Sequence, residues 1–185
     1  ELKLQQARHA NPLTLLPGNI PIQQCLQRLL ERQVDARLCY IDLDNFKPFN
    51  DLYGYGKGDE ILLGLAQLLR ELCDPRCDFV GHIGGDDFML VMRSDDWHAR
   101  LHQLDQRFQQ LCRTLYRAEH IQANGFTAPD REGKWRHHDL LNLSIGVISL
   151  PGHQASLYDA ARLAELASRA KHDAKKQRGF SVVMQ

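Results

Sequence analysis

Apolar residues recur along the chain with two different periods, and their order predicts how helices and strands alternate. Spacings of three and four residues predict helices, whereas short apolar or alternating runs predict strands. The predicted helices cover residues 22–33, 58–72, 97–116 and 157–177. The predicted strands cover residues 37–42, 78–83, 88–93, 141–150 and 180–184, and one more helix is expected directly after the first strand.

This order of elements predicts an α/β protein of the α+β type. We expect a mixed, mainly antiparallel central sheet flanked by helices. Residues 120–138 are polar, rich in glycine and charge, and lack clear periodicity, so they predict an excursion or hairpin before the strand at 141–150. Residues 1–10 resemble the C-terminal end of a linker helix from an upstream domain, which leaves one domain over residues 11–185.

Two acidic segments mark the candidate chemistry. The first predicted strand ends on Asp-Leu-Asp-Asn at 42–45, and Gly-Gly-Asp-Asp at 84–87 lies between two later strands. A buried strand that stops at an aspartate delivers a carboxylate to the sheet edge, and carboxylates are hard oxygen ligands for Mg²⁺. The glycines let a ligand approach the main chain. Two structural alternatives remain open: segment 84–87 as a plain hairpin turn, and segment 42–45 as a helix cap.

The motifs of this chain, taken in order, resemble those of the GGDEF family of diguanylate cyclases. The resemblance is carried by residues 42–47, Asn50-Asp51, Gly54, Gly58-Asp59 and residues 84–88. Weaker matches are Leu13-Thr14 with Leu16-Pro17, Ser144-Ile145-Gly146-Val147, and Ala174-Lys175. Several motifs in register over about 170 residues are more specific than any one of them.

The resemblance implies a fold like that of nucleotidyl cyclases and polymerase palms, and a definite reaction. Two GTP molecules would condense to cyclic di-GMP with release of pyrophosphate, in a homodimer that uses Mg²⁺ or Mn²⁺ for two-metal phosphoryl transfer. The implied metal ligands are Asp42, the Leu43 carbonyl, Asp86 and Asp87, of which Asp86 and Asp87 are also the implied catalytic residues. The implied GTP-binding residues are Asn45, Phe46, Lys47, Asn50, Asp59, Gly84, Gly85, Lys175 and Arg178.

Two departures from the family pattern define an alternative function. Asp87 stands where the family has glutamate, so its carboxylate is shorter by one methylene, about 1.5 Å of reach. Asp78 matches the aspartate of the family's product-feedback motif, but Pro75 replaces its arginine, and we expect no standard inhibitory site. The alternative is a GTP-binding regulatory domain without turnover, which controls an attached phosphodiesterase domain of the EAL type.

Composition narrows the class of protein further. The 185 residues are 43% hydrophobic, enough for one substantial core. The 23 basic and 23 acidic residues balance, which argues against a general nucleic-acid-binding surface. No apolar run approaches the ~18 residues that a membrane helix needs, so we expect a cytoplasmic domain without direct membrane contact. The five cysteines lack zinc-site spacing and are expected to be reduced thiols.

Overall fold

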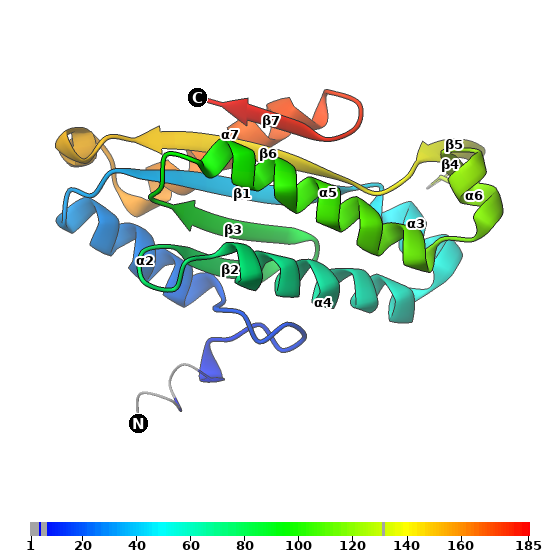
Figure 1. Cartoon of the computed structure of the whole chain (residues 1–185), viewed down its shortest axis with the longest axis horizontal. Coiled ribbons are helices and arrows are strands. Elements are labelled where there is room, and N and C mark those ends of the chain that lie inside the picture. Colours follow the sequence, from blue (N-terminus) through cyan, green and yellow to red (C-terminus); the bar gives the residue numbers. More distant parts are fainter. Residues whose placement is uncertain (1–3, 5–6, 131) are drawn as a thin grey trace.

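The computed structural model describes residue 4, residues 7–130 and residues 132–185. It contains a five-stranded sheet with helices on both faces and a separate two-stranded hairpin (Figure 1). The helices are α2 (Asn19–Glu31), α3 (Phe46–Tyr53), α4 (Tyr55–Leu72), α5 (Trp97–Leu115), α6 (Ala118–Gln122) and α7 (Ala160–Lys175). The strands are β1 (Ala36–Asp44), β2 (Phe79–Gly84), β3 (Asp87–Met92), β4 (Gly125–Pro129), β5 (Trp135–Asp139), β6 (Asn142–Leu150) and β7 (Ser181–Met184).

The central sheet has the strand order β2-β3-β1-β6-β7, with β1 in the middle. Strand β1 runs antiparallel to both β3 and β6, β2 is antiparallel to β3, and only β6 and β7 pair in parallel. The expectation of a mixed, mainly antiparallel sheet is therefore confirmed. The predicted excursion at 120–138 contains the β4–β5 hairpin, which stands apart from this sheet.

Side chains of β1 alternate between the two faces of the sheet, as strand geometry requires. Cys39, Ile41 and Leu43 belong to the apolar core beneath α4 and α5. Leu38 belongs to the second core cluster, which α2 and α7 cover on the opposite face. Asp42 shares that second face, so its carboxylate emerges at the polar end of the layer between β1 and α7.

Several predicted boundaries were wrong by a few residues, and two of the differences have a local reason. Helix α4 begins at Tyr55 instead of Gly58, because Gly54 adopts φ +89° and ends α3 in a sharp break. Strand β1 continues to Asp44, two residues beyond the expected end. Helix α7 begins at Ala160 instead of Leu157, where the carboxylate of Asp159 caps its first turn.

Residues 1–3 and 5–6 of the predicted linker helix lie outside the described residues, whereas Ala7 and Arg8 are helical. Among the described helices, none combines the length and the apolar character needed to cross a bilayer.

Candidate active site

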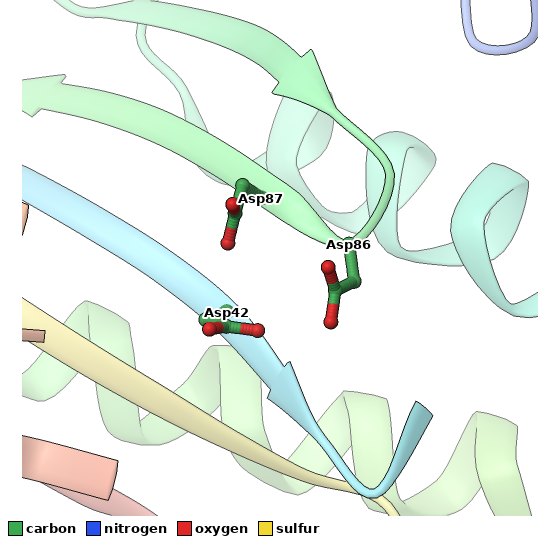
Figure 2. Close-up of side chains that lie close together, drawn as sticks. All are labelled: Asp42, Asp86 and Asp87. Carbon is green, nitrogen blue, oxygen red and sulfur yellow. The ribbon is translucent and has the colours of Figure 1, made fainter. Parts of the chain in front are cut away.

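Three carboxylates from two neighbouring strands converge at one end of the sheet. The register of β1 and β3 places Asp42 directly opposite Asp87, and Asp86 occupies the turn that precedes β3. One oxygen from each of the three side chains lies within 4.8 Å of the others (Figure 2). The two acidic segments are thus brought together, and their oxygens form a ligand set suited to a hard divalent cation.

The turn that carries Asp86 is shaped by glycine and held by two hydrogen bonds. Gly85 has φ +53°, a left-handed conformation that an L side chain would disfavour. The ring of His82 bonds the Gly85 carbonyl through Nε2 at 2.9 Å, and the Leu43 amide donates to the Asp86 carbonyl at 3.3 Å. The turn is therefore fixed to both β2 and β1.

His82 is a buried connector that the sequence did not identify as a site residue. It is 2% exposed, it stacks on Phe88 at a centroid distance of 4.1 Å, and burial lowers its pKa. A carbonyl can only accept, so Nε2 must carry the proton toward Gly85. The Nδ1 atom of the neutral ring then accepts from the hydroxyl of Thr14, 2.9 Å away. His82 thus links the N-terminal turn of the domain to the glycine turn.

The three carboxylates lie close enough to repel one another. Two full charges 4.8 Å apart repel by about 3 kcal/mol at an effective dielectric constant of about 20. Burial, followed by the charge of Asp42, raises the pKa of Asp86 to about 7, and the same two causes raise the pKa of Asp87. Among the described residues, no hydrogen-bond partner reaches the buried Oδ1 atom of Asp42 or Asp87. Such unpaired buried oxygens indicate a site that is completed by a ligand.

Helix α7 supplies two lysines to this cluster. Lys175 Nζ lies 2.6 Å from Asp42 Oδ2 and 3.8 Å from Asp44 Oδ1. Lys171 Nζ lies 3.3 Å from Asp42 Oδ2 and 3.8 Å from Asp87 Oδ1. Lys171 was not among the predicted site residues, although its position one turn before Lys175 places both on the same helix face.

Three of the other predicted GTP-binding residues line a groove, whereas Phe46 and Lys47 lie outside it. Asn45 enters α3 with a left-handed φ of 64°, and it lines a cavity of about 400 Å³ together with Lys175 and Arg178. Arg178 is exposed and makes a bidentate contact with Asp139, with both distances 2.7 Å. Phe46 packs partly against the core at the start of α3. Lys47 is directed to Asp51, 2.7 Å away, on the surface of the same helix.

The predicted guanine-reading residues lie on the helix pair α3–α4. Asn50 is half-buried, and among the described residues its Oδ1 atom has no hydrogen-bond partner. Gly58 packs directly against it, since a Cβ at that position would lie 1.8 Å from Asn50 Oδ1. Asp59 follows on the exposed side of α4. An amide and a carboxylate have the acceptors and donors that match the edge of guanine.

Asp78, the remaining acidic residue of the feedback motif, has a structural role in this chain. Its side chain is 0% exposed and pairs with Arg100 at 2.8 Å. It also accepts the backbone amides of Asp74 at 3.0 Å and Arg93 at 3.1 Å. The carboxylate of Asp78 is therefore fully engaged within the fold.

Comparison with known proteins identifies the family of the chain. Residues 9–179 match the family described as "Diguanylate cyclase, GGDEF domain". Diguanylate cyclase DgcM of Escherichia coli (strain K12) is 48% identical to this chain over 97 residues, which are 50% of this chain and 23% of DgcM. Diguanylate cyclase DgcN of the same strain is 29% identical to this chain over 184 residues, which are 97% of this chain and 40% of DgcN.

A solved structure extends the comparison to the whole fold. Diguanylate cyclase SiaD of Pseudomonas aeruginosa, crystallised with its activator SiaC, superposes with a TM-score of 0.70 at 25% identity. The similarity covers 100% of this chain and 64% of SiaD. The family match spans nearly the entire sequence, and it includes both acidic segments that form the carboxylate cluster. The chain therefore belongs to the GGDEF domain family.

Proposed function

We propose that this domain is a diguanylate cyclase that condenses two GTP molecules into cyclic di-GMP and pyrophosphate. The observation that carries the proposal is the convergence of the Asp42, Asp86 and Asp87 carboxylates in a chain of the GGDEF family. Clustered carboxylates repel one another and cost stability when no cation is present, so their retention favours a site under chemical demand.

The residues present fit a divalent cation, either Mg²⁺ or Mn²⁺. The Oδ1 atoms of Asp42 and Asp87, which have no hydrogen-bond partner among the described residues, are hard, anionic donors, and Asp86 and the Leu43 carbonyl would complete the set. When bound, such ions supply positive charge against the triphosphate and the attacking hydroxyl. The chain's own contribution is to hold these oxygens at fixed positions on β1 and on the glycine turn.

The GTP triphosphate would lie in the groove between α3 and the end of α7. The backbone amides at Asn45 and Phe46, at the start of α3, would donate to its phosphate oxygens in the way helix N-termini do. Gly84 and Gly85 allow the triphosphate to approach the turn closely. Lys175 and Arg178 line the groove and add positive charge, and Lys47 adds charge on α3.

Guanine recognition is assigned to Asn50 and Asp59, and catalysis to a pair of domains. In a homodimer, each domain would present the 3′-hydroxyl of its GTP to the α-phosphate of the other. The 3′-oxygen forms the new bond to phosphorus, its proton is lost to solvent or to a carboxylate of the site, and the bond to the pyrophosphate oxygen breaks. Two such steps close the cyclic dinucleotide.

The test is to incubate the domain with GTP and Mg²⁺ or Mn²⁺ and to analyse the products by mass spectrometry. We expect cyclic di-GMP and pyrophosphate from the unchanged domain. Asp87→Glu, which restores the family's longer carboxylate, should retain or increase the rate. Asp95→Glu lengthens an exposed carboxylate away from the site in the same way and should leave the rate unchanged. Absence of both product and nucleotide binding would refute the proposal.

A regulatory GTP-binding domain attached to an EAL-type phosphodiesterase is the second candidate function. The observation that favours it is the shorter Asp87, whose Oδ2 accepts a hydrogen bond from Tyr40 at 3.3 Å within the fold. This candidate predicts tight GTP binding without product, together with synthesis of cyclic di-GMP by Asp87→Glu. Product from the unchanged domain excludes it.

A further inference from the structure

Lys171 is the most deeply buried cation of the site, and no step of the proposed reaction uses it. Only 8% of its side chain is exposed, compared with 36% for Lys175 one turn later on α7. Its ammonium group lies 3.3 Å from Asp42 and 3.8 Å from Asp87, the two carboxylates that face each other across β1 and β3. Lys171 is thus placed between two of the three carboxylates that repel one another.

The position of Lys171 is determined by close packing of α7 on β6. A Cβ at Gly146 would lie 2.1 Å from the backbone nitrogen of Lys171, so this approach is possible only because residue 146 has no side chain. Tyr40 supports the ammonium group from the other side, with its ring centroid 4.7 Å from Nζ. The Tyr40 hydroxyl also donates to Asp87 Oδ2 at 3.3 Å. Tyr40 and Lys171 therefore both contact the carboxylate of Asp87 and fix its position.

The two lysines differ in what they can do when a nucleotide arrives. Lys175 is partly exposed and lines the groove, so its ammonium group can leave Asp42 and contact a phosphate. Lys171 is enclosed between α7, Tyr40 and the two carboxylates, and it has no comparable route to the groove. Its charge remains with the carboxylates whether or not a metal ion is bound.

We infer that Lys171 is the resident cation of the carboxylate cluster. It holds Asp42 and Asp87 in their facing positions before a divalent ion binds, and its fixed charge weakens the binding of that ion. The inference rests on the proposed function in one respect only, that the cluster binds a divalent ion. Lys171 is a positioning residue, because it acts through the two aspartates.

The inference predicts opposite effects of Lys171 on the metal-free and metal-bound protein. Without Lys171, the facing carboxylates repel each other in the metal-free state, whereas a bound divalent ion still neutralises them. Lys171→Met keeps most of the apolar stem and removes the charge. We expect its Tm to fall more in EDTA than in saturating Mn²⁺, and its Mn²⁺ affinity to rise about tenfold, within the range usual for coupled sites.

The experiment is thermal unfolding with and without Mn²⁺, combined with Mn²⁺ titration by calorimetry, for the unchanged domain and Lys171→Met. Arg169→Met is the matched control, because it removes an exposed charge from the same helix. It should leave both Mn²⁺ affinity and the Mn²⁺-induced rise in Tm unchanged. Equal Tm losses for Lys171→Met in EDTA and in Mn²⁺ would overturn the inference, as would weaker Mn²⁺ binding.

A second measurement on the unchanged domain covers the case in which Lys171→Met does not fold. Carbon NMR of selectively labelled lysines should show the Lys171 side-chain resonance shift when Mg²⁺ binds, and an unshifted resonance would overturn the inference. Mn²⁺ binding with no dependence on Lys171 refutes this inference alone. Failure of the unchanged domain to bind Mn²⁺ refutes the inference and the metal-dependent function together.

Discussion

Asp42 and Asp78 are both aspartates with nearly inaccessible side chains, 5% and 0% exposed, yet their surroundings differ. Asp78 receives two backbone amides and the guanidinium of Arg100, so each of its oxygens is bonded within the fold. Asp42 pairs with Lys171 and Lys175 through Oδ2 alone and faces two other carboxylates, and among the described residues its Oδ1 atom has no hydrogen-bond partner. A buried carboxylate whose two oxygens are both bonded within the fold serves stability, whereas one that keeps an open oxygen indicates a ligand.

Substitution of Asp42 is expected to have the largest effect and gives the strongest test of the contrast between Asp42 and Asp78. Asp42→Asn preserves shape but removes the charge that a divalent ion needs. We expect synthesis of cyclic di-GMP to fall about 10²- to 10³-fold, the effect of removing one electrostatic group from an active site. The free energy of unfolding in EDTA should fall less than in Asp78→Ala, because Lys171 keeps Asp87 as a partner, Lys175 keeps Asp44, and repulsion within the cluster is relieved. Product formation and urea unfolding measure the two effects, and a large loss of stability would contradict our distinction.

Asp78→Ala should show the reverse pattern. It leaves Arg100 as a buried charge without its partner, so the free energy of unfolding should fall by about 3–5 kcal/mol. Cyclase activity per folded molecule should be retained. Arg76→Ala removes an exposed ion pair to Asp74 nearby and should change the free energy of unfolding far less, because solvent screens the pair. Equal effects of the two substitutions in urea unfolding would show that Asp78 is not structural.

The raised pKa of Asp86 predicts that stability depends on pH, with an effect that is smaller than those of the substitutions above and that changes when a metal ion is added. Because the pKa of Asp86 is raised from 3.8 to about 7, the folded metal-free protein binds more protons than the unfolded chain between these values. This contribution to stability is complete below 3.8 and is lost as pH rises through about 7. Urea unfolding in EDTA should show the decline. Asp86→Asn should make it shallower, and Mg²⁺ should stabilise most at the high-pH end.

The smallest effect on activity is expected at Asn50, whose Oδ1 atom also lacks a hydrogen-bond partner among the described residues. Gly58→Ala would displace the Asn50 side chain, since the new Cβ would lie 1.8 Å from Oδ1. Loss of one hydrogen bond to guanine, worth about 1 kcal/mol, predicts a roughly fivefold higher KM for GTP. Gly56→Ala introduces the same methyl group with no atom within 4 Å and is the matched control. An unchanged KM for GTP in Gly58→Ala would show that Asn50 does not bind guanine.

Local sequence pattern was sufficient for the parts of the site that depend on strands and turns. The buried apolar run before Asp42 predicted that its carboxylate lies at the edge of the sheet, and the glycines before Asp86 indicated a turn that a ligand can approach. The antiparallel register of β1 and β3 then made Asp42 and Asp87 direct neighbours. These features depend on short stretches of chain whose conformation is largely set by their own residues.

The residues that were missed depend on contacts between distant segments. Lys171 reaches the carboxylates only because α7 packs closely on Gly146. The sequence pattern of α7 does not indicate which strand the helix packs against. His82 looked like an ordinary strand residue, since its role requires both Thr14 and Gly85 at the two ring nitrogens. The break at Gly54 was also missed, because glycine within a helical pattern does not by itself specify a positive φ.

The two hydrogen bonds on the glycine turn have a consequence for nucleotide recognition. With the Gly85 carbonyl bonded to His82 and the Asp86 carbonyl bonded to Leu43, the turn keeps one shape before any ligand arrives. Folding has already removed the conformational freedom that a glycine-rich loop would otherwise lose on association. If GTP binds here as proposed, it meets a preformed turn, and its affinity is not reduced by the entropy of ordering a loop.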